Sequence, residues 1–319
     1  MKVIVLSSEL QQKHLKLIKE TAEKIGADVC FAVTEDDIPE DYKDAEILYG
    51  FGMRTAARSK QLKWLCVPSA GVEYLFKPGT FANEDCIITN SAGAFGVSIA
   101  EHIIMVSLMM MRKMMITFRR SISGEWGDRL PQKSLKDCRI TVLGTGDIGC
   151  CFARRAKAFE PKKLIGICRS GMCDEAAFDE IIKSDDMDRI LPETDLLIMC
   201  LPATAETKGI LSEGRISMLP SDSYVVNVGR GSAIDEDALA DALDENRLAG
   251  AALDVFLNEP LPESSRLWTT KNLLITPHVA GNLTIDYTID KNVEMFCEDL
   301  INYANGRSLE HLVDKIKGY

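Results

Sequence analysis

Three side chains that could take part in chemistry stand directly after short apolar runs in the second half of the chain: Arg230, Glu259 and His278. Arginine presents a planar, permanently charged fork that matches a carboxylate. Histidine has an ordinary pKa of about 6.5, so it can donate or accept a proton near neutral pH. A carboxylate beside an imidazole favours the imidazolium form and fixes its tautomer. These residues could therefore hold a substrate carboxylate and exchange a proton with a neighbouring carbonyl oxygen.

Each of these residues also has an ordinary structural explanation. An arginine at a strand end is commonly a surface ion-pair partner, and a single histidine is often a satisfied polar contact. Glu259 precedes a proline, which is typical of a solvated loop acid. The three side chains share a position at the ends of successive predicted strands, where open parallel sheets bind ligands. That common position, together with a glycine-rich turn at residues 144–149, favours the catalytic interpretation.

The glycine-rich turn reads Gly144-Thr145-Gly146-Asp147-Ile148-Gly149. It lies directly after a predicted strand, Ile140–Leu143, and opens a predicted helix, Ile148–Phe159. In this pattern the first glycine makes a tight turn, the second lets the backbone approach a pyrophosphate, and the third permits close helix–strand packing. Glycine-rich turns are common, so the strand before it and the helix after it are what favour dinucleotide binding over a plain turn.

The next predicted strand ends in Cys168-Arg169-Ser170. An acidic residue about twenty positions past the glycines would bind the adenosine ribose 2′-hydroxyl of NAD, but no acid appears before Asp174. A guanidinium with a neighbouring hydroxyl suits a 2′-phosphate, although Arg169 could also be a surface arginine at a strand end. We therefore expect NADP to be preferred, with NAD possible.

The elements that must position these residues form two α/β blocks, because short β-branched runs alternate with helical periodicity. In the first block, strands are predicted at Val3–Leu6, Val29–Val33, Ile47–Tyr49, Leu62–Val67 and Ile87–Thr89, with a helix near Leu10–Lys24. A long helix is predicted from Ser98 to Arg119. In the second block, strands are predicted at Ile140–Leu143, Leu164–Cys168, Leu196–Cys200, Tyr224–Val228, Gly250–Val255 and Leu273–Thr276. The predicted fold class is α/β, with two Rossmann-like doubly wound parallel-sheet domains and a cleft between them.

Bulk composition excludes several function classes. The chain has 319 residues and a formal net charge of −11, which disfavours binding to nucleic acid. Its most apolar helical stretch ends at Arg112, well short of the ~20 residues needed to span a membrane, and its first residues form a strand rather than a secretory signal. The ten cysteines include no Cys-x-x-Cys pair and are interpreted as packing residues in a reducing compartment. We expect a cytoplasmic protein with no bound metal and no membrane partner.

The combined motifs resemble the D-isomer-specific 2-hydroxyacid dehydrogenase family over essentially the whole chain. The matching segments are Ser69–Val72, Ala100–His102, Gly144–Gly149, Leu201–Thr204, Asn227–Gly231, Asp254, Glu259 and His278–Gly281. The resemblance implies that Arg230, Glu259 and His278 are catalytic, and that the backbone at Ser69, Ala70, Gly71 and Val72 binds the substrate carboxylate. Arg230 and His278 are also expected to contact the substrate. It implies that Asp254 contacts the nicotinamide carboxamide. The other expected coenzyme contacts are the turn at 144–149, Cys168, Arg169, Ser170, Leu201, Pro202, Thr207, Val228, Gly229 and Gly281.

The resemblance also implies a domain division. Residues 1–97 with 283–319 would form a discontinuous substrate-binding domain, and residues 98–282 a dinucleotide-binding domain. Hinges would lie near Val97 and at Gly281-Asn282. The family further implies a homodimer, with a contact region around Trp126 that sometimes reaches the partner's site.

The segment Cys168-Arg169-Ser170 resembles the NADP-preferring glyoxylate/hydroxypyruvate reductase branch of the family. The expected activity is hydride transfer between NADP(H), or NAD(H), and C2 of a small 2-keto or 2-hydroxy acid such as glyoxylate or hydroxypyruvate, with D stereospecificity and His278 as general acid/base. Two alternatives stay open: a reductase of bulkier branched or aromatic 2-keto acids, and a nucleotide-sensing, corepressor-like binding protein on the same fold. His102 is a rival base, although its family position is structural.

Overall fold

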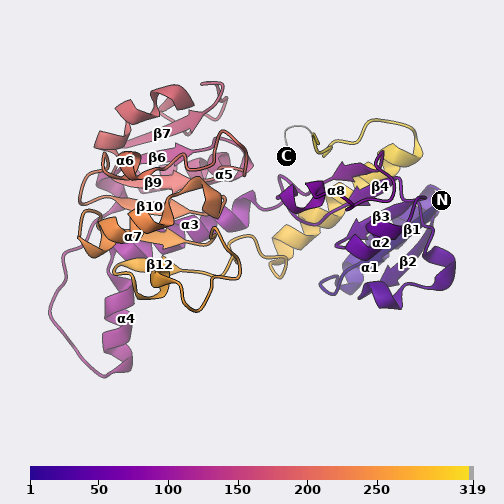
Figure 1. Cartoon of the computed structure of the whole chain (residues 1–319), viewed down its shortest axis with the longest axis horizontal. Coiled ribbons are helices and arrows are strands. Elements are labelled where there is room, and N and C mark those ends of the chain that lie inside the picture. The colour runs from indigo at the N-terminus through magenta and orange to yellow at the C-terminus, as the bar shows by residue number, and fades with distance from the viewer. Residues whose placement is uncertain (316–319) are drawn as a thin grey trace. The chain divides into compact units, whose positions relative to one another are not determined.

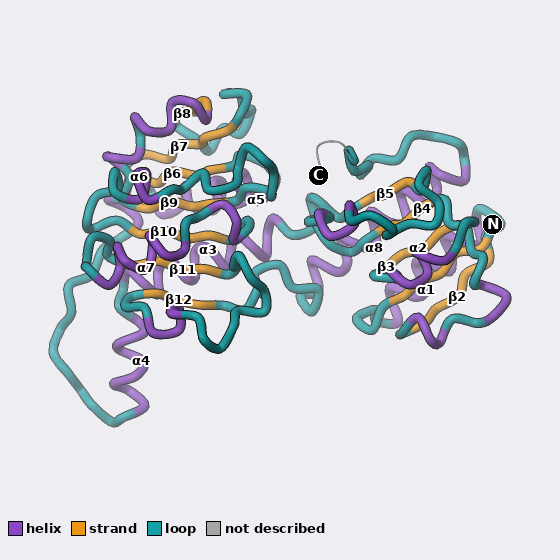
Figure 2. Tube along the Cα trace, in the orientation of Figure 1, coloured by secondary structure: helices purple, strands orange, loops and turns teal. Residues whose placement is uncertain are grey.

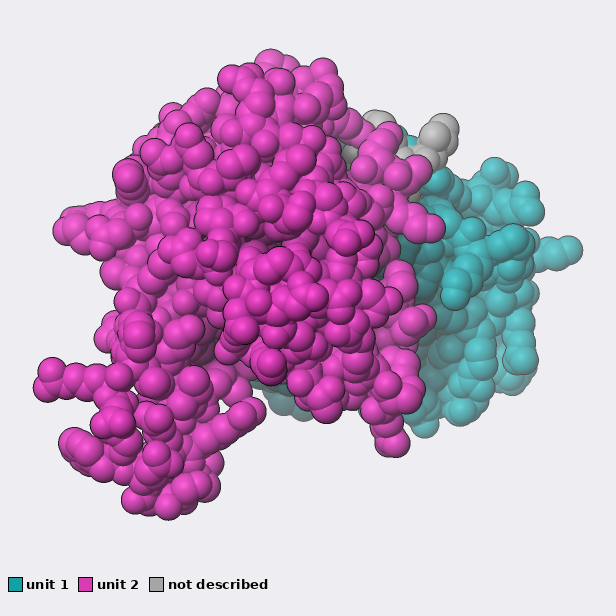
Figure 3. All heavy atoms as spheres, turned by 60° about the vertical axis from the view of Figure 1, so that its left-hand side comes forward, with its two compact units in different colours: residues 1–95, 282–319 teal, residues 96–281 magenta. Residues whose placement is uncertain are grey.

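The structure is a computed structural model, and it describes residues 1–315. The chain divides into two compact units, one made of residues 1–95 and 282–319 and the other of residues 96–281 (Figure 3). The division predicted from the sequence falls one or two residues later, after 97 and 282. The last four residues of the predicted substrate domain, 316–319, lie outside the described residues.

The first unit is built on one sheet of five parallel strands in the order β2-β1-β3-β4-β5. Its strands are β1 (Lys2–Leu6), β2 (Asp28–Ala32), β3 (Ile47–Gly50), β4 (Trp64–Cys66) and β5 (Ile87–Thr89). Its helices are α1 (Gln12–Lys24), α2 (Met53–Arg58) and α8 (Asp286–Ala304), so α8 returns from the end of the chain to complete the unit (Figure 1).

Alternating side chains of these strands give the sheet two buried faces. Val3 and Val5 point to the side covered by α1 and α8, where they pack with Phe296 of α8. Ile4 and Leu6 point to the opposite side and join a separate apolar cluster that includes Ala56 of α2. A strand buried on both faces explains why the sequence shows an unbroken apolar run there.

The second unit contains seven parallel strands in the order β12-β11-β10-β9-β6-β7-β8 (Figure 2). They are β6 (Arg139–Leu143), β7 (Lys163–Cys168), β8 (Glu180–Lys183), β9 (Leu196–Met199), β10 (Tyr224–Asn227), β11 (Gly250–Leu253) and β12 (Leu273–Ile275). The chain winds outward in one direction from β6 through β8 and then in the other from β9 through β12. This reversal between β6 and β9 is the point at which doubly wound sheets bind ligands.

Helices lie on both faces of this second sheet. They are α3 (Gly96–Met111), α5 (Asp147–Ala156), α6 (Glu213–Ile216) and α7 (Glu236–Asp244). α3 packs along α5 and also contacts β10 and β11. The largest apolar cluster of the unit joins strand residues such as Leu143 and Val225 to α7 residues such as Leu239. The two α/β domains with parallel sheets that the sequence predicted are therefore confirmed.

One sequence-based prediction of local structure is wrong, and one strand was not predicted. The single helix predicted over Ser98–Arg119 is broken at Lys113, whose φ of 55° is left-handed and cannot continue an α-helix. The chain resumes as α4 (Met114–Ile122), which has no buried residue and extends away from the rest of its unit (Figure 1). The strand β8 was not predicted, because its four residues begin and end with charged side chains. Among residues 1–315, no helix is both long and apolar enough to cross a membrane.

Candidate active site

The glycine-rich turn joins β6 to the first turn of α5. Gly144 has a φ of 100°, and a side chain there would lie 2.7 Å from the Cys200 carbonyl oxygen. A Cβ on Gly149 would lie 2.0 Å from the Gly144 carbonyl oxygen, so the helix can pack onto the turn only with glycine there. Gly146, the N-cap of α5, has no atom within 4 Å of such a Cβ. The turn is thus tightly packed at two glycines and open at the third, beside a helix N-terminus, which fits the pyrophosphate of a dinucleotide.

The remaining turn residues also lie at this site. Thr145 and Ile148 are partly buried, while Asp147 is exposed in the first turn of α5. The Asp147 carboxylate fills the space beside Gly96, where an added Cβ would lie 2.4 Å from one of its oxygens. This close contact ties the start of α3 to the start of α5.

The segment predicted to select the coenzyme follows β7. Arg169 is exposed, and its guanidinium lies 3.9 Å from the Glu206 carboxylate. The Ser170 hydroxyl donates to the Met172 carbonyl oxygen and accepts from the Met172 N–H, both at 3.2 Å. Burial raises the pKa of the Cys168 thiol, but hydrogen bonds with Ser170 and Thr145 outweigh it, and the net shift is downward. An exposed guanidinium and an ordered hydroxyl therefore lie at the end of the second strand of the dinucleotide fold, where the adenosine ribose binds.

The ends of β9 and β10 are packed backbone against backbone. A Cβ on Gly229 would lie 2.5 Å from the Leu201 carbonyl oxygen, and the buried Val228 donates its N–H to Met199 at 3.1 Å. After Leu201, the Thr207 hydroxyl donates to the Pro202 carbonyl oxygen at 2.6 Å and orders the loop. These contacts place the backbone of both strand ends at one edge of the sheet, next to the glycine-rich turn.

Arg230 is held by its neighbours in the β10 turn. The Asn227 side chain accepts from the Gly229 N–H at 3.1 Å and donates to the Arg230 carbonyl oxygen at 3.0 Å. The Arg230 guanidinium donates to the Gly229 carbonyl oxygen at 2.7 Å. A Cβ on Gly231 would lie 1.9 Å from the Phe256 carbonyl carbon, so the chain leaving Arg230 passes directly over the end of β11. The turn therefore fixes the backbone from which the guanidinium projects.

His278 and Glu259 form a hydrogen-bonded pair. The imidazole Nδ1 lies 2.6 Å from Glu259 Oε2, and the other carboxylate oxygen accepts from the Phe256 N–H at 2.8 Å. Half of the His278 side chain is exposed. Because Nδ1 is engaged by the carboxylate, Nε2 is the nitrogen that can exchange a proton with a substrate, as in other carboxylate–histidine pairs.

Asp254 fixes the loop that carries His278. Its buried carboxylate accepts hydrogen bonds from the Thr276 hydroxyl at 2.6 Å, from the Val279 N–H at 2.9 Å and from the Ala280 N–H at 3.0 Å. Its carbonyl oxygen accepts from the His278 N–H at 2.8 Å. These four bonds hold His278 at a left-handed φ of 54°, and the loop then leads to Gly281, the last residue of the unit.

His102, the rival base, lies behind this loop rather than at its surface. Its Nε2 is 3.3 Å from the Thr276 hydroxyl and 3.9 Å from an Asp254 carboxylate oxygen. Burial lowers the pKa of His102 more than the Asp254 charge raises it. A neutral, nearly buried imidazole that contacts Thr276 is suited to support the loop.

The predicted substrate loop belongs to the first unit. The Ser69 hydroxyl donates to the Gly71 carbonyl oxygen at 2.9 Å. The Asn90 side chain donates to the Ala70 carbonyl oxygen at 2.9 Å, and Val72 is buried in the core of its unit. Side-chain donors therefore hold the carbonyl groups of both Ala70 and Gly71 in the loop after β4, and Gly71 is partly exposed.

Three supporting residues were not assigned roles from the sequence: Asn227, Thr276 and Asn90. Each is a polar residue at the end of an apolar strand, buried or partly buried in the structure. A buried polar side chain must find hydrogen-bond partners, so a polar residue at the end of an apolar strand is a signal that it supports nearby backbone. The sequence alone does not say which groups those partners are.

Residues 104–280 match the model of the family described as D-isomer specific 2-hydroxyacid dehydrogenase, NAD binding domain. The chain belongs to the D-isomer-specific 2-hydroxyacid dehydrogenase family. It is therefore an oxidoreductase with an NAD(P)-binding domain, as the sequence predicted.

Individual relatives agree with this membership. A probable 2-ketogluconate reductase of Dictyostelium discoideum is 33% identical over 218 residues, covering 66% of this chain and 64% of that protein. A glyoxylate reductase of Thermofilum pendens is 28% identical over 259 residues, covering 80% of this chain and 75% of that protein. A crystal structure of a family member from Xanthobacter autotrophicus Py2, in complex with NADPH and MES, has a TM-score of 0.82 at 26% identity and covers 99% of both chains.

Proposed function

We propose that this dehydrogenase reduces a small 2-keto acid such as glyoxylate or hydroxypyruvate to the D-2-hydroxy acid, with NADP(H) preferred and His278 as the general acid. The observation that carries the proposal is the 2.6 Å hydrogen bond between His278 and Glu259. It lies on the same edge of the sheet as Arg230 and a turn that fits a dinucleotide pyrophosphate.

The proposed roles follow from the chemistry of the side chains. The coenzyme, when bound, supplies the hydride that adds to C2. The Arg230 guanidinium binds the substrate carboxylate and orients C2. His278 donates the proton from Nε2 to the carbonyl oxygen as that oxygen gains negative charge. Glu259 holds the ring through Nδ1 and stabilises its charged form, and in the oxidation direction the neutral ring accepts the proton back.

We also propose roles for the substrate loop and for Asp254. The partly exposed backbone at Gly71 is proposed to bind the substrate carboxylate, because Ser69 and Asn90 already hold the carbonyl groups of Gly71 and Ala70 in place. Asp254 is proposed to reach the nicotinamide carboxamide. Its carboxylate also holds the loop that bears His278, so Asp254 would link the position of the bound coenzyme to the position of the general acid.

Coenzyme preference is proposed from the segment after β7. The guanidinium of Arg169 and the hydroxyl of Ser170 match a phosphate, whereas NAD-selective folds place an acid near this point. The relative from Xanthobacter autotrophicus Py2 was solved with NADPH, which supports the same choice. Glyoxylate as substrate is supported by the glyoxylate reductase of Thermofilum pendens.

A bulkier 2-keto acid is the second candidate, favoured by the similarity to a probable 2-ketogluconate reductase. The test is kcat/KM for a panel of 2-keto acids, from glyoxylate and hydroxypyruvate to 2-ketogluconate and branched or aromatic acids, each with NADPH and NADH. The proposal expects the highest kcat/KM with a two- or three-carbon acid and NADPH. A preference for 2-ketogluconate selects the second candidate, and no turnover with any acid while dinucleotide binds selects the nucleotide-sensing alternative.

A homodimer is proposed from the surface of α4 and the segment after it. Phe118 and Ile122 are 61% and 73% exposed, and Trp126 is fully exposed. So many large apolar side chains on one short helix and its continuation are typical of a protein–protein contact. Light scattering on the purified chain should give twice the mass of one chain, and F118E/I122E should give the mass of one.

A further inference from the structure

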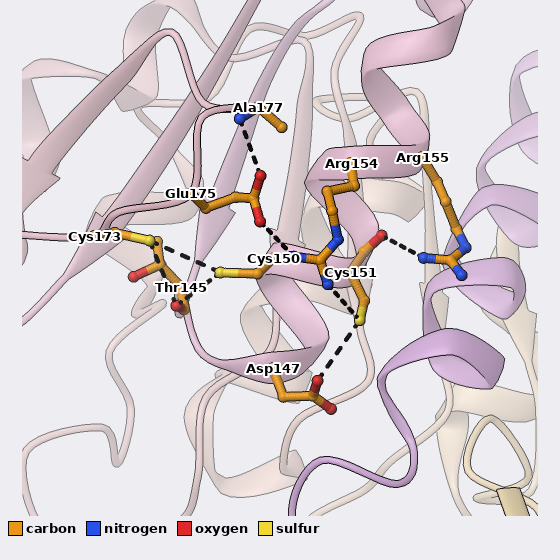
Figure 4. Close-up of polar contacts among 9 residues, drawn as sticks. All are labelled: Thr145, Asp147, Cys150, Cys151, Arg154, Arg155, Cys173, Glu175 and Ala177. Carbon is orange, nitrogen blue, oxygen red and sulfur yellow. Dashed lines mark hydrogen bonds and ion pairs between the residues drawn. The ribbon is translucent and has the colours of Figure 1, made fainter.

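Two of the ten cysteines lie in contact beside the glycine-rich turn. Cys150 follows the last glycine of the turn in the first half of α5, and Cys173 comes from the irregular segment between β7 and β8. Their sulfur atoms are 3.8 Å apart, and the two side chains point toward one another (Figure 4). Two free thiols that are 23 positions apart in sequence are thus in contact.

Both thiols also contact the backbone of the turn. The Cys150 Sγ lies 3.2 Å and the Cys173 Sγ 3.8 Å from the Thr145 carbonyl oxygen, and each can donate its S–H to it. Thr145 stands between Gly144, which makes the tight turn, and Gly146, at which the backbone would approach the pyrophosphate. Through these contacts with the Thr145 carbonyl oxygen, the two thiols help to hold the backbone of the proposed phosphate site.

An ion pair holds the two segments together. Arg154 of α5 pairs with Glu175, two residues after Cys173 (Figure 4). The second Glu175 carboxylate oxygen accepts the Ala177 N–H at 3.1 Å, which orders the segment near Cys173. The neighbouring Cys151 faces another direction, since its sulfur contacts Asp147 at 3.6 Å and Arg154 at 3.1 Å.

We infer that Cys150 and Cys173 are an oxidisable pair whose disulfide weakens dinucleotide binding. A disulfide needs an S–S distance of about 2.05 Å, so the sulfurs must approach one another, and Cys173 lies on the segment without regular structure. The segment that moves begins with Arg169 and Ser170, the proposed 2′-phosphate contacts. Disulfide formation also removes both S–H donors from the Thr145 carbonyl oxygen.

The chemistry balances with a hydroperoxide as oxidant. Cys173, on the partly exposed segment, attacks the peroxide oxygen and becomes a sulfenic acid, releasing water or an alcohol. Burial and the contact with Cys173 raise the pKa of Cys150, so Cys150 is the weaker nucleophile toward the peroxide and is assigned the resolving role. As the Cys150 sulfur attacks the Cys173 sulfur, its thiol proton passes to the sulfenic oxygen, water leaves, and the S–S bond forms. Two thiols and one hydroperoxide give one disulfide, one water and one further water or alcohol.

The disulfide itself is tested on the intact chain without any activity assay. Trypsin cuts after Arg139, Arg154, Arg169 and Lys183, so peptide 140–154 carries Cys150 and peptide 170–183 carries Cys173, while Cys168 falls on a separate peptide. After brief treatment with hydrogen peroxide, non-reducing mass spectrometry should show 140–154 linked to 170–183. C151S should keep the link, and C150S and C173S should each lose it. No link in the wild type, or a link that persists in C150S, would overturn the inference.

The effect on binding is measured separately, and it rests on the proposed function. Oxidised wild type should bind NADPH at least about fivefold more weakly than reduced wild type, with dithiothreitol restoring affinity. By reciprocity, saturating NADPH should slow disulfide formation. C173S should be insensitive to peroxide, whereas C151S should respond like wild type. If the disulfide forms but NADPH affinity stays unchanged, the inference fails. If reduced protein binds NADH but not NADPH, the coenzyme proposal fails, and the effect of the disulfide is then read with NADH.

Discussion

The two ends of the dinucleotide-binding sheet differ in how firmly their functional residues are held. At the β11–β12 end, the Asp254 carboxylate accepts three hydrogen bonds and is almost entirely buried. At the β7 end, the Arg169 side chain is 66% exposed, and its guanidinium lies 3.9 Å from the Glu206 carboxylate. Catalytic groups must be held within about 0.5 Å of the productive geometry, whereas an exposed guanidinium can bind a phosphate at the surface through charge-assisted hydrogen bonds.

From this difference we expect mutations at one end to change the stability of the fold and mutations at the other to change only the affinity for coenzyme. Removing a buried acceptor leaves N–H groups unpaired and costs about 1–3 kcal/mol for each. Removing an exposed cation leaves the folded state nearly unchanged. Changes at the β11–β12 end should therefore alter folding, turnover or both, and a change at Arg169 should alter only coenzyme binding.

The largest effect is expected from His278→Asn. Asparagine cannot exchange a proton near neutral pH, so kcat should fall by about 10²–10⁴-fold while the Kd for coenzyme, measured by fluorescence titration, changes little. His102→Gln is the matched control, because it removes a histidine of the same loop network that is proposed to have no chemical role. Near wild-type turnover in H278N, or an equal loss of turnover in H102Q, would contradict the assignment.

A similar test of the carboxylate site uses Arg230→Lys, which keeps the charge and removes the planar fork. Loss of a charge-assisted hydrogen bond costs about 1.5–3 kcal/mol, so kcat/KM for the 2-keto acid should fall by about 10–150-fold. Steady-state kinetics with saturating coenzyme checks the effect. An unchanged kcat/KM would show that the substrate carboxylate is bound elsewhere, and arginine to lysine at the exposed Arg189 provides a control for expression and folding.

Asp254→Asn separates the two roles proposed for that residue. The amide cannot accept from the Val279 and Ala280 N–H groups and the Thr276 hydroxyl together, so we expect the free energy of unfolding without coenzyme to fall by about 2–3 kcal/mol. Thermal or denaturant unfolding measures it. A variant with normal stability but weak coenzyme binding would instead mean that the carboxylate acts mainly on the nicotinamide.

The sequence predicted the strands and the glycine-rich turn better than it predicted the break in the long helix. The strands and the glycine-rich turn follow from apolar periodicity, because both faces of each sheet are buried and glycine tolerates a φ of 100° at Gly144. The break at Lys113 could not be predicted, since nothing in an apolar helical pattern marks a left-handed residue. The structure gives Glu259 and His278 the hydrogen bond that the family resemblance implied, and brings both close to the Asp254 network.

The supporting contacts were beyond prediction for a different reason. Thr276 contacts His102, which is 174 residues earlier in the sequence, and no local pattern specifies such a pair. Cysteine gave a misleading signal as well. Six of the ten are buried, as expected of packing residues, but Cys150, Cys168, Cys173 and Cys200 are only partly buried. The contact between Cys150 and Cys173 depends on how the segment after β7 folds back on α5.

At the β7 end, Arg169→Asp should exchange coenzyme preference with little other effect. A carboxylate repels a 2′-phosphate and accepts from a ribose 2′-hydroxyl, so kcat/KM with NADPH should fall by about tenfold or more while that with NADH rises or stays level. The melting temperature should not change, because the wild-type side chain is exposed. An unaltered NADPH/NADH ratio would remove Arg169 from the coenzyme site.

The smallest effect is expected from the pH dependence of stability at His102. Burial lowers the pKa of His102 in the folded chain, whereas in the unfolded chain it returns to about 6.5. Below that value the unfolded state binds more protons than the folded state, so the contribution of His102 is present at neutral pH and is lost as the pH falls through 6.5 toward the lower folded pKa. In His102→Gln the amide can still contact Thr276 but does not titrate. The gap in melting temperature between wild type and H102Q should therefore shift in favour of the variant between pH 7.5 and 5, and a gap independent of pH would mean that His102 is not buried in neutral form behind the catalytic loop.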